Sequence, residues 1–331
     1  MTTLETLGRK LETLGDLRDV VRTMKALSSS NLRQVELAAD ALADYYRGVE
    51  LGLHVALRAG HAATPDPNPR TGGQSKSVVA ILFGTDYGMC SRLNQTLCEY
   101  AIERLADAGI SVAERRFLVV GAKAAAHLQS ASQPVHTCLA TPGSAEGIGE
   151  LVAQLLTIID RLRDEGDADR VWLFFNQHLP TGPDRSAAGA RRRVSATPDD
   201  QDDPLTEPRT GTRPFLVHLL PLDEHHLRRA RELRWPGRGL PTHSLPASTL
   251  LASLVRQYLF VSLSRACAES QASEHQARLL ATQAAERNIA REIERSGVEF
   301  RMLRQEAITS EILDVVSGYE ASRGANADLP A

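Results

Sequence analysis

The feature that most constrains the fold is a long C-terminal stretch without proline. From Ala247 to Glu320 the chain contains no proline, and its only glycines there are Gly297 and Gly318. Apolar residues recur through this stretch at steps of three and four, which is the period of one helix face. A helix of this length would extend on the order of 100 Å, which favours a coiled coil or a helical shaft. The apolar positions are Leu250, Leu251, Leu254, Tyr258, Val261, Leu280, Ala284, Ile289, Ile293, Phe300, Leu303, Ile308, Ile312, Val315 and Val316.

The N-terminal segment has the same pattern before the first proline, Pro65. Its apolar spacing predicts a helix on the order of 80 Å long. Neither terminal helix can bury its apolar stripe alone, so we expect the two helices to pair in antiparallel orientation. Burial of each leucine in such a seam contributes about 1.5–3 kcal/mol. The apolar positions are Leu4, Leu7, Leu11, Leu14, Leu17, Val21, Met24, Leu27, Leu32, Val35, Ala39, Leu42, Tyr46, Val49 and Leu53.

The middle of the chain follows a different pattern, in which short apolar runs alternate with helical stretches. The runs predict strands at Val78–Phe83, Phe117–Gly121, Val171–Phe175 and Phe215–Leu220, and the helical stretches are Leu93–Asp107 and Gly149–Asp164. Strands that alternate with helices indicate a largely parallel sheet. The predicted fold class is therefore α/β: a small Rossmann-like α/β domain flanked by a long antiparallel coiled coil of the N- and C-terminal helices.

These patterns divide the chain into four parts. The predicted parts are an N-terminal coiled-coil helix at 1–60, an α/β domain at 75–222, a C-terminal coiled-coil helix at 247–320 and a tail at 321–331. Within the α/β domain, residues 180–214 are rich in proline, glycine, aspartate and arginine. That composition predicts a long flexible surface loop.

Composition argues against several classes of function. The formal net charge is −3, so no strongly basic surface indicates nucleic acid as a partner. No apolar stretch reaches the roughly 18 residues of a membrane-spanning helix, so we expect action at a membrane only from outside the lipid. The four cysteines form no CxxC pair, which predicts reduced thiols rather than a zinc or redox site.

The sequence offers few candidates for chemistry. Residues 84–88 follow a predicted strand, as a phosphate-binding loop would, but they contain neither GxGxxG nor GK[ST]. We therefore expect a tight turn in which Asp86 accepts hydrogen bonds from backbone amides. His218, His225 and His226 lack a third ligand at a known metal-site spacing. With no trio of nucleophile, base and orienting residue in view, we predict no catalytic residue, no cofactor and no metal.

Three segments resemble a known family, in the family's order along the chain. They are VVRTMKALSSSNLRQVE near the N-terminus, LFGTDYGMCSRLN at the first predicted strand, and SEHQARLLATQAAERNIAREIERSGVEFRMLRQEAITSEILDVVSG near the C-terminus. Together they resemble the γ subunit of F-type ATP synthases. The matching residues are Met24, Lys25, Leu32 and Arg33 in the first segment, Asp86, Gly88, Cys90, Leu93 and Asn94 in the second, and Glu274, Ala277, Arg278, Ala281, Asn288, Arg304, Gln305, Ile308, Thr309, Glu311, Val316, Ser317 and Gly318 in the third.

The resemblance implies a central-stalk rotor subunit without catalysis of its own. Such a subunit couples ion flow through a membrane c-ring to ATP synthesis or hydrolysis in a ring of α and β subunits, with the ε subunit alongside. The complex would be peripheral to the membrane, on the cytoplasmic side of a bacterial inner membrane. The residues implied in contacts with the β ring are Met24, Lys25, Arg33, Arg278, Arg304, Gln305, Thr309 and Glu311. The residues implied in the turn of the α/β domain are Asp86, Gly88, Cys90 and Asn94.

Departures from the family pattern leave alternatives open. Tyr87 replaces an arginine of the turn, and Ser91 and Arg92 replace a Gly-Gly. Gly297 and Arg301 interrupt the C-terminal pattern. A divergent γ subunit of an alternative F-type ATPase, coupled to H⁺ or Na⁺, fits these departures. A second class of function is an α/β ligand-binding or enzyme module with coiled-coil oligomerisation arms, which would need a pocket with titratable residues.

Overall fold

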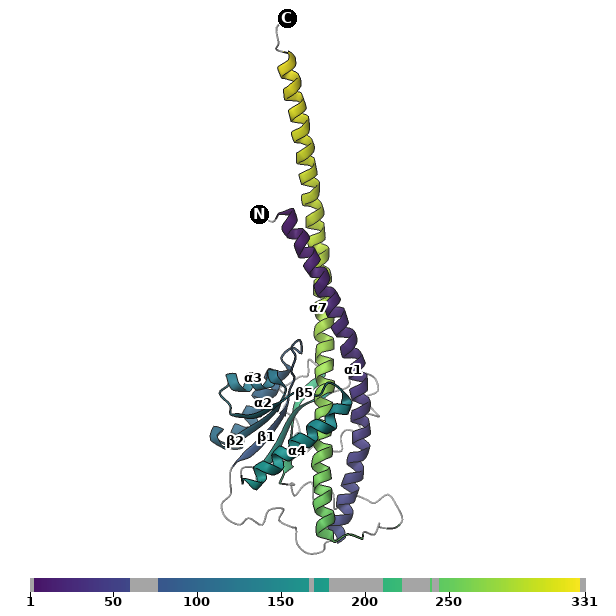
Figure 1. Cartoon of the computed structure of the whole chain (residues 1–331), viewed down its shortest axis with the longest axis vertical. Coiled ribbons are helices and arrows are strands. Elements are labelled where there is room, and N and C mark those ends of the chain that lie inside the picture. The colour runs from purple at the N-terminus through teal and green to yellow at the C-terminus, as the bar shows by residue number, and fades with distance from the viewer. Residues whose placement is uncertain are drawn as a thin grey trace. The chain divides into compact units, whose positions relative to one another are not determined.

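The computed structural model describes most of the chain and divides it into two compact units. The described residues are 3–59, 77–166, 170–178, 211–221, 239 and 244–327. The first unit combines Met1–Leu27 with Leu280–Ala331, and the second unit is Ser28–Leu279. Two long helices, α1 (Leu4–Ala59) and α7 (Ala247–Ala327), contribute residues to both units (Figure 1). Both terminal helices predicted from apolar spacing are therefore present.

The second unit contains a five-stranded sheet with the order β3-β2-β1-β4-β5. Its strands are β1 (Val78–Phe83), β2 (Arg115–Val120), β3 (Val135–Leu139), β4 (Arg170–His178) and β5 (Thr212–Leu220). Strands β1 to β4 run parallel to one another, and β5 pairs antiparallel with β4. The prediction of a largely parallel sheet is confirmed.

Three features of the second unit differ from the sequence-based expectation. The apolar pattern does not predict β3, because it is an edge strand whose residues are half-buried or exposed. It also misses helix α3 (Ala122–Ser130), whose nine residues are too few to establish a helical period. Strand β5 begins inside the predicted flexible loop, because Thr212 and Pro214 pair with β4. The rest of that loop up to residue 210 lies outside the described residues.

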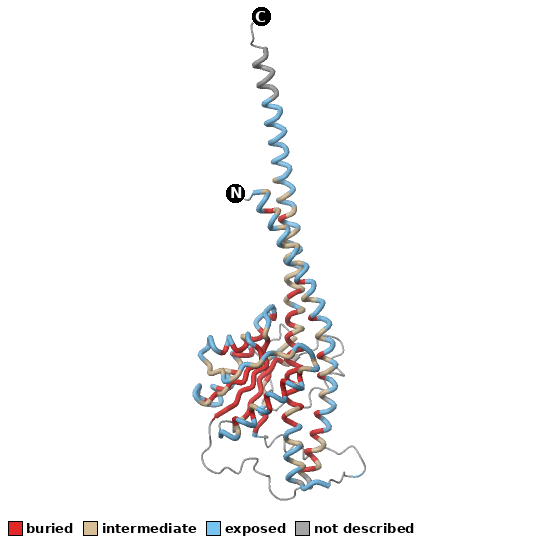
Figure 2. The backbone as a smooth tube through the Cα atoms, in the orientation of Figure 1, coloured by how far each residue is buried: buried red, intermediate tan, exposed pale blue. Residues whose placement is uncertain are grey.

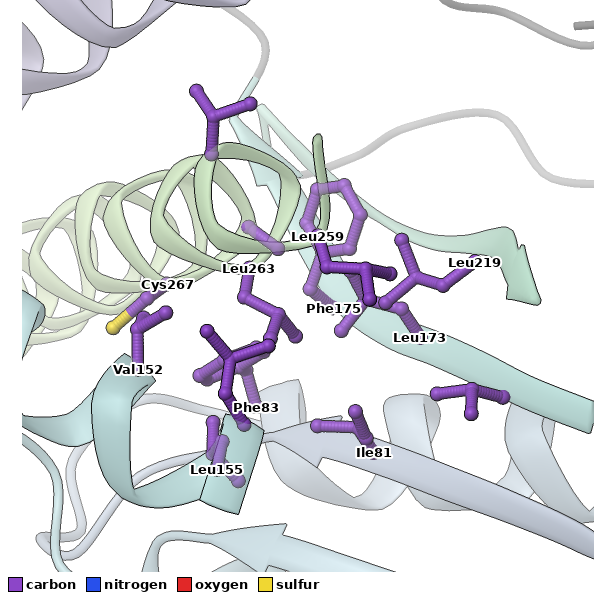
Figure 3. Packing of buried hydrophobic residues seen from close by; sticks show 14 of the residues in the cluster. Ile81, Phe83, Val152, Leu155, Leu173, Phe175, Leu219, Leu259, Leu263 and Cys267 are labelled. Carbon is purple, nitrogen blue, oxygen red and sulfur yellow. The ribbon is translucent and has the colours of Figure 1, made fainter. Parts of the chain in front are cut away.

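Helices cover both faces of the sheet, so successive strand residues enter two separate cores. On one face lie α2 (Leu93–Asp107) and α3. On the other face lie α4 (Ile148–Asp164) and the second unit's parts of α1 and α7. Figure 3 shows side chains of α4 and α7 packed against those of the strands. Because both faces are buried, β1 is a continuous apolar run rather than an alternating one. Two short 3₁₀ helices, η1 (Val112–Glu114) and η2 (Ala145–Gly147), precede β2 and α4.

The terminal helices pair in antiparallel orientation within the second unit. The rings of Tyr46 and Tyr258 lie 5.9 Å apart, and the Tyr45 hydroxyl donates a hydrogen bond to Gln257. Further along α1, Gly52 lies against the side chain of Leu254. Residue numbers thus rise along α1 as they fall along α7.

The same antiparallel order holds within the first unit. Lys10 of α1 pairs with Glu292 of α7 at 2.5 Å, and Lys25 pairs with Glu286 at 2.9 Å. The predicted antiparallel pairing of the terminal helices is confirmed in both units by these contacts. In the part of the chain that the structure describes, no helix is long and apolar enough to cross a membrane.

Burial changes along α7, as the colours of Figure 2 show. In the second unit, most residues between Tyr258 and Leu279 are buried or half-buried against the sheet and α1. In the first unit, Leu303 is half-buried, and every residue at 304–318 is exposed. This exposed stretch includes large apolar side chains, namely Ile308, Ile312, Leu313, Val315 and Val316. Nothing in the described part of the chain covers it.

Candidate functional site and partner surfaces

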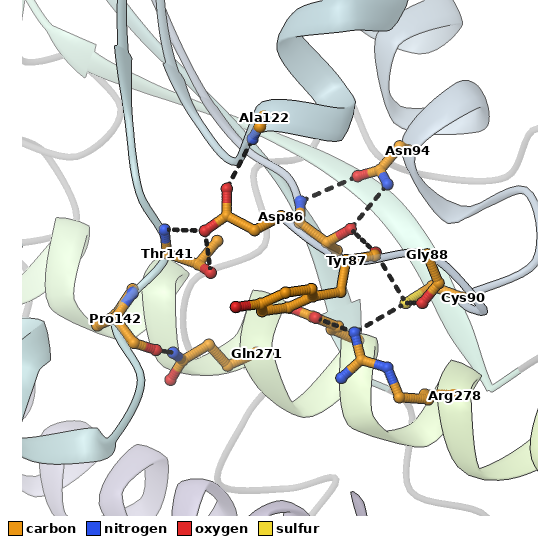
Figure 4. A network of polar contacts seen from close by, with 12 residues as sticks. Asp86, Tyr87, Gly88, Cys90, Asn94, Ala122, Thr141, Pro142, Gln271 and Arg278 are labelled. Carbon is orange, nitrogen blue, oxygen red and sulfur yellow. Dashed lines mark hydrogen bonds and ion pairs between the residues drawn. The ribbon is translucent and has the colours of Figure 1, made fainter. Parts of the chain in front are cut away.

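The turn after β1 is organised by one carboxylate. Asp86 accepts hydrogen bonds from the backbone N–H of Ala122 at 2.8 Å and of Thr141 at 2.7 Å (Figure 4). The Thr141 hydroxyl donates a third at 2.7 Å. Burial raises the pKa of Asp86, but these three hydrogen bonds outweigh burial, and the net pKa lies below the usual value. Asp86 therefore accepts two backbone hydrogen bonds in the turn where a tight turn was expected.

Asn94 closes the same turn onto the start of α2. Its side-chain oxygen accepts the Thr85 N–H at 3.0 Å, and its amide nitrogen donates to the Thr85 hydroxyl at 2.9 Å. The Cys90 thiol donates to the Gly88 carbonyl at 3.3 Å, and burial raises the pKa of that thiol to about 11. The four residues that the resemblance assigned to this turn therefore lie together.

Removal of the Asp86 charge is expected to destabilise the second unit. In Asp86→Asn only one oxygen accepts, and the amide NH₂ meets donors, so the expected loss is about 1–3 kcal/mol at pH 7. The folded-state pKa of Asp86 is lower than its unfolded-state pKa of about 3.9. The contribution of this charge to the free energy of unfolding is therefore complete above about pH 3.9, and it disappears as pH falls through the folded-state pKa. In urea unfolding, the difference in unfolding free energy between Asp86→Asn and wild type should therefore be smaller at pH 3 than at pH 7.

The matched control for this measurement is Asp107→Asn, at an exposed carboxylate at the end of α2. That variant should stay within about 0.5 kcal/mol of wild type. An Asp86→Asn variant as stable as the control at pH 7 would contradict the assigned role of Asp86.

The turn also contains strained backbone at a position where the family resemblance has glycine. Ser91 has φ of 54°, which lies in the left-handed region. For a residue with a Cβ, that conformation costs about 1–2 kcal/mol. Ser91→Gly removes that strain but gains freedom in the unfolded chain, so we expect a net stabilisation of about 0.5–1 kcal/mol. The same change at Ser29, an exposed residue in the interior of α1, should instead destabilise by about 0.5–1 kcal/mol. Denaturant midpoints of the two variants should move in opposite directions.

Helix α7 covers the carboxyl edge of the sheet. The hydroxyl of Ser270 donates to the Phe83 carbonyl at the end of β1, and that of Ser273 donates to the Asn176 carbonyl of β4, both at 2.8 Å. Strand order reverses between β1 and β4, which is where open α/β sheets hold ligands. Here the side chains of this chain's own helix meet those strand ends. These two hydrogen bonds therefore fix α7 to this edge of the sheet.

Arg278 is held inside the second unit. It is buried, forms a short ion pair with Glu274 one turn earlier on α7, and lies 3.4 Å from the Cys90 sulfur. Burial lowers the pKa of Arg278, but the facing carboxylate outweighs it and raises the net pKa. The expectation that Arg278 contacts a β subunit does not agree with this burial, because its guanidinium is directed to groups of this chain. It connects α7 to the turn after β1.

The other implied contact residues remain accessible in the structure. Met24 and Lys25 are half-buried on α1, and Arg33 is exposed. On α7, Arg304, Gln305, Thr309 and Glu311 are exposed, and the Thr309 hydroxyl donates to the Gln305 backbone carbonyl at 2.8 Å. The sequence reasoning did not single out Glu286, which faces Lys25. The signal in the sequence was the charge pattern: the α7 segment contains the acidic Glu286, and the α1 segment contains the basic Arg22 and Lys25.

The histidines singled out in the sequence fall in two groups. The ring of His218 on β5 lies against that of Trp172 on β4 in a tilted arrangement, with ring centroids 4.6 Å apart. His225 and His226 lie outside the described residues. Among the residues that the structure does describe, no group of three or more His, Cys, Asp or Glu side chains is placed to hold a metal ion.

A family model described as ATP synthase matches residues 3–321, nearly the whole chain, and curated relatives over the same extent are γ chains. The chain belongs to the ATP synthase γ family. The γ chain of Chromobacterium violaceum is 26% identical over 315 residues, covering 94% of this chain and 96% of the relative. That of Thermosynechococcus vestitus is 26% identical over 350 residues, covering 98% and 100%.

Solved structures agree on the fold of this γ-family chain. A chain of the Euglena gracilis mitochondrial ATP synthase OSCP/F1/c-ring structure has a TM-score of 0.55 at 14% identity, covering 99% of this chain and 97% of its own length. A chain of the rotor structure from the same organism has a TM-score of 0.53 at 14% identity, covering 92% and 98%. The function predicted from the resemblance is confirmed at the level of the family: a non-catalytic central-stalk subunit, peripheral to the membrane, of an F-type ATP synthase.

Proposed function

We propose that the exposed end of α7, residues 304–318, turns inside the ring of α and β subunits. The observation that carries the proposal is the full exposure of this stretch, apolar side chains included. Exposed apolar surface of this extent is typical of a protein–protein interface. An apolar sleeve around the helix would bury these side chains and still permit rotation, because dispersion contacts have little directional preference.

Polar residues on the same stretch would make contacts that depend on rotary position. Arg304, Gln305, Thr309 and Glu311 would each need a hydrogen-bonding partner inside a dry sleeve, because an unpaired buried polar group is costly. On α1, we propose that Met24, Lys25 and Arg33 contact an acidic loop of β. Contacts that form in one position and break in the next give each β subunit a different neighbour, so nucleotide affinity changes as the shaft turns.

The remaining partners and the location follow from the same proposal. The α/β domain would rest on the c-ring with ε alongside, on the cytoplasmic side of a bacterial inner membrane. The coupled ion is H⁺ or Na⁺. An α/β ligand-binding module with oligomerisation arms is less well supported, because α7 already occupies the sheet edge where such a module would bind its ligand.

A pull-down from native membranes tests the proposed assembly. A tagged copy of this chain should recover α, β, ε and c subunits together. Recovery of this chain alone, as a homodimer, would contradict the rotor proposal and favour the ligand-binding module. Calorimetry with ATP on the purified chain gives a second discriminator, since tight stoichiometric binding fits only the module.

A further inference from the structure

One carboxylate in the first unit holds two cations of the opposite helix. The Oε1 atom of Glu286 lies 3.1 Å from Arg22 Nε, and its Oε2 atom lies 2.9 Å from Lys25 Nζ. Arg22 and Lys25 are three residues apart on α1, so their side chains share one face of the helix. The two side chains keep 58% and 39% of their surface exposed, against 24% for Glu286. Both cations are therefore neutralised only in part and still face outward.

The hydrogen bonds from Lys25 and Arg22 hold the pKa of Glu286 below its usual value. Glu286 is thus ionised at neutral pH and places a single negative charge between two positive charges. A cation that is already paired with one carboxylate attracts a second carboxylate less strongly than an unpaired cation does. Glu286 also fixes the orientation of the Lys25 side chain, because one oxygen of the carboxylate is directed to Lys25 and the other to Arg22.

We propose that Glu286 is a positioning residue, which holds Arg22 and Lys25 against α7 and limits how firmly an acidic partner surface can capture them as the shaft turns. This inference rests on the proposed contact between Lys25 and an acidic loop of β. Without Glu286, two free cations face that surface. Each rotary step must then break stronger ion pairs, which slows turnover.

The test uses the assembled complex and measures ATP hydrolysis as a function of salt. Glu286→Gln should lower turnover about two- to five-fold at low ionic strength, the range expected of partly exposed ion pairs. High salt should restore the rate, because the screening length falls from about 10 Å at 0.1 M to about 3 Å at 1 M. The double change Glu286→Gln with Lys25→Gln should recover most of the lost rate. Glu286→Asp, whose carboxylate is one methylene shorter and so contacts the two cations less closely, should be intermediate.

Glu292 on the same helix gives a matched control. It also bridges two cations, Lys10 at 2.5 Å and Arg295 at 2.8 Å, and has a similar exposure of 29%. Neither cation is among the proposed β contacts. Glu292→Gln should therefore keep wild-type turnover at every salt concentration, which separates a general loss of helix pairing from the effect proposed for Glu286.

The outcomes separate this inference from the function on which it rests. A Glu286→Gln complex that behaves like Glu292→Gln would overturn the inference. So would a loss of rate that neither salt nor Lys25→Gln relieves, since that pattern indicates a structural role alone. If Lys25→Gln by itself leaves turnover and its salt dependence at wild-type values, Lys25 does not meet the ring, and the proposed contact fails instead.

Discussion

Replacement of Arg278 by methionine is expected to destabilise the second unit by about 3–5 kcal/mol. The change removes the partner of Glu274, which is buried beside it, and leaves a carboxylate without its counter-charge in an apolar site. It also removes the guanidinium that contacts the Cys90 sulfur and connects α7 to the turn after β1. Urea unfolding of the purified chain, followed by circular dichroism, measures the loss.

The pH dependence of this variant should identify the cause. Burial already raises the pKa of Glu274, and loss of Arg278 removes the main opposing influence. When the folded pKa of a carboxyl exceeds its unfolded pKa of about 4.3, its contribution to stability is complete below about pH 4.3. That contribution is lost as pH rises through the folded pKa. The destabilisation by Arg278→Met should therefore be larger at pH 8 than at pH 4.

Two further variants serve as controls for the prediction on Arg278→Met. Arg256→Met removes an exposed ion pair with Asp160, at 3.3 Å, and should cost less than about 1 kcal/mol. A double variant, Glu274→Leu with Arg278→Met, replaces the whole buried pair by apolar groups and should recover much of the lost stability. If Arg278→Met cost no more than Arg256→Met, the guanidinium would be free for a partner, and the contact implied by the sequence resemblance would be supported after all.

The terminal helices and most of the sheet were predictable because their signals are periodic and local. Apolar spacing along α1 and α7 indicates helix regardless of what each helix packs against. Strands β1, β2 and β4 each contain a short run of apolar residues. Strand β3 lacks that signal, because its residues alternate between half-buried and exposed and include polar side chains.

The contacts of α7 with the sheet edge could not be predicted from the sequence. Ser270 bonds a carbonyl 187 residues away, and Arg278 contacts a sulfur 188 residues away. The helical period indicates which α7 residues share a face, but it does not indicate which strand ends that face meets. Arg278 and Arg304 both match the γ family on the same helix, yet one is buried and the other exposed. Only the packing distinguishes them.

Simultaneous replacement of Arg304 and Gln305 by alanine is expected to lower ATP turnover and ion pumping of the assembled complex roughly ten-fold or more. Both side chains are exposed, and within the described residues the Arg304 guanidinium forms no ion pair or hydrogen bond. In a ring sleeve, these neighbouring donors would bind carboxylates or hydroxyls of the partner. A hydrogen bond to a charged group contributes about 1.5–3 kcal/mol, so its loss in one rotary position changes the relative energies of the positions.

The chain itself should remain folded in this variant, because neither side chain contributes to a core. Circular dichroism of the isolated subunit checks that point. Arg291→Ala gives a matched control: it removes an exposed arginine from the same helix, but one whose guanidinium already bonds Asn288 of its own chain. That control should keep wild-type turnover, since a solvated surface change is worth about 0.5 kcal/mol or less. If the double variant turns over and pumps like the control, Arg304 and Gln305 face water in the complex. The proposal that this end of α7 turns inside the ring would then have to rest on its apolar residues alone.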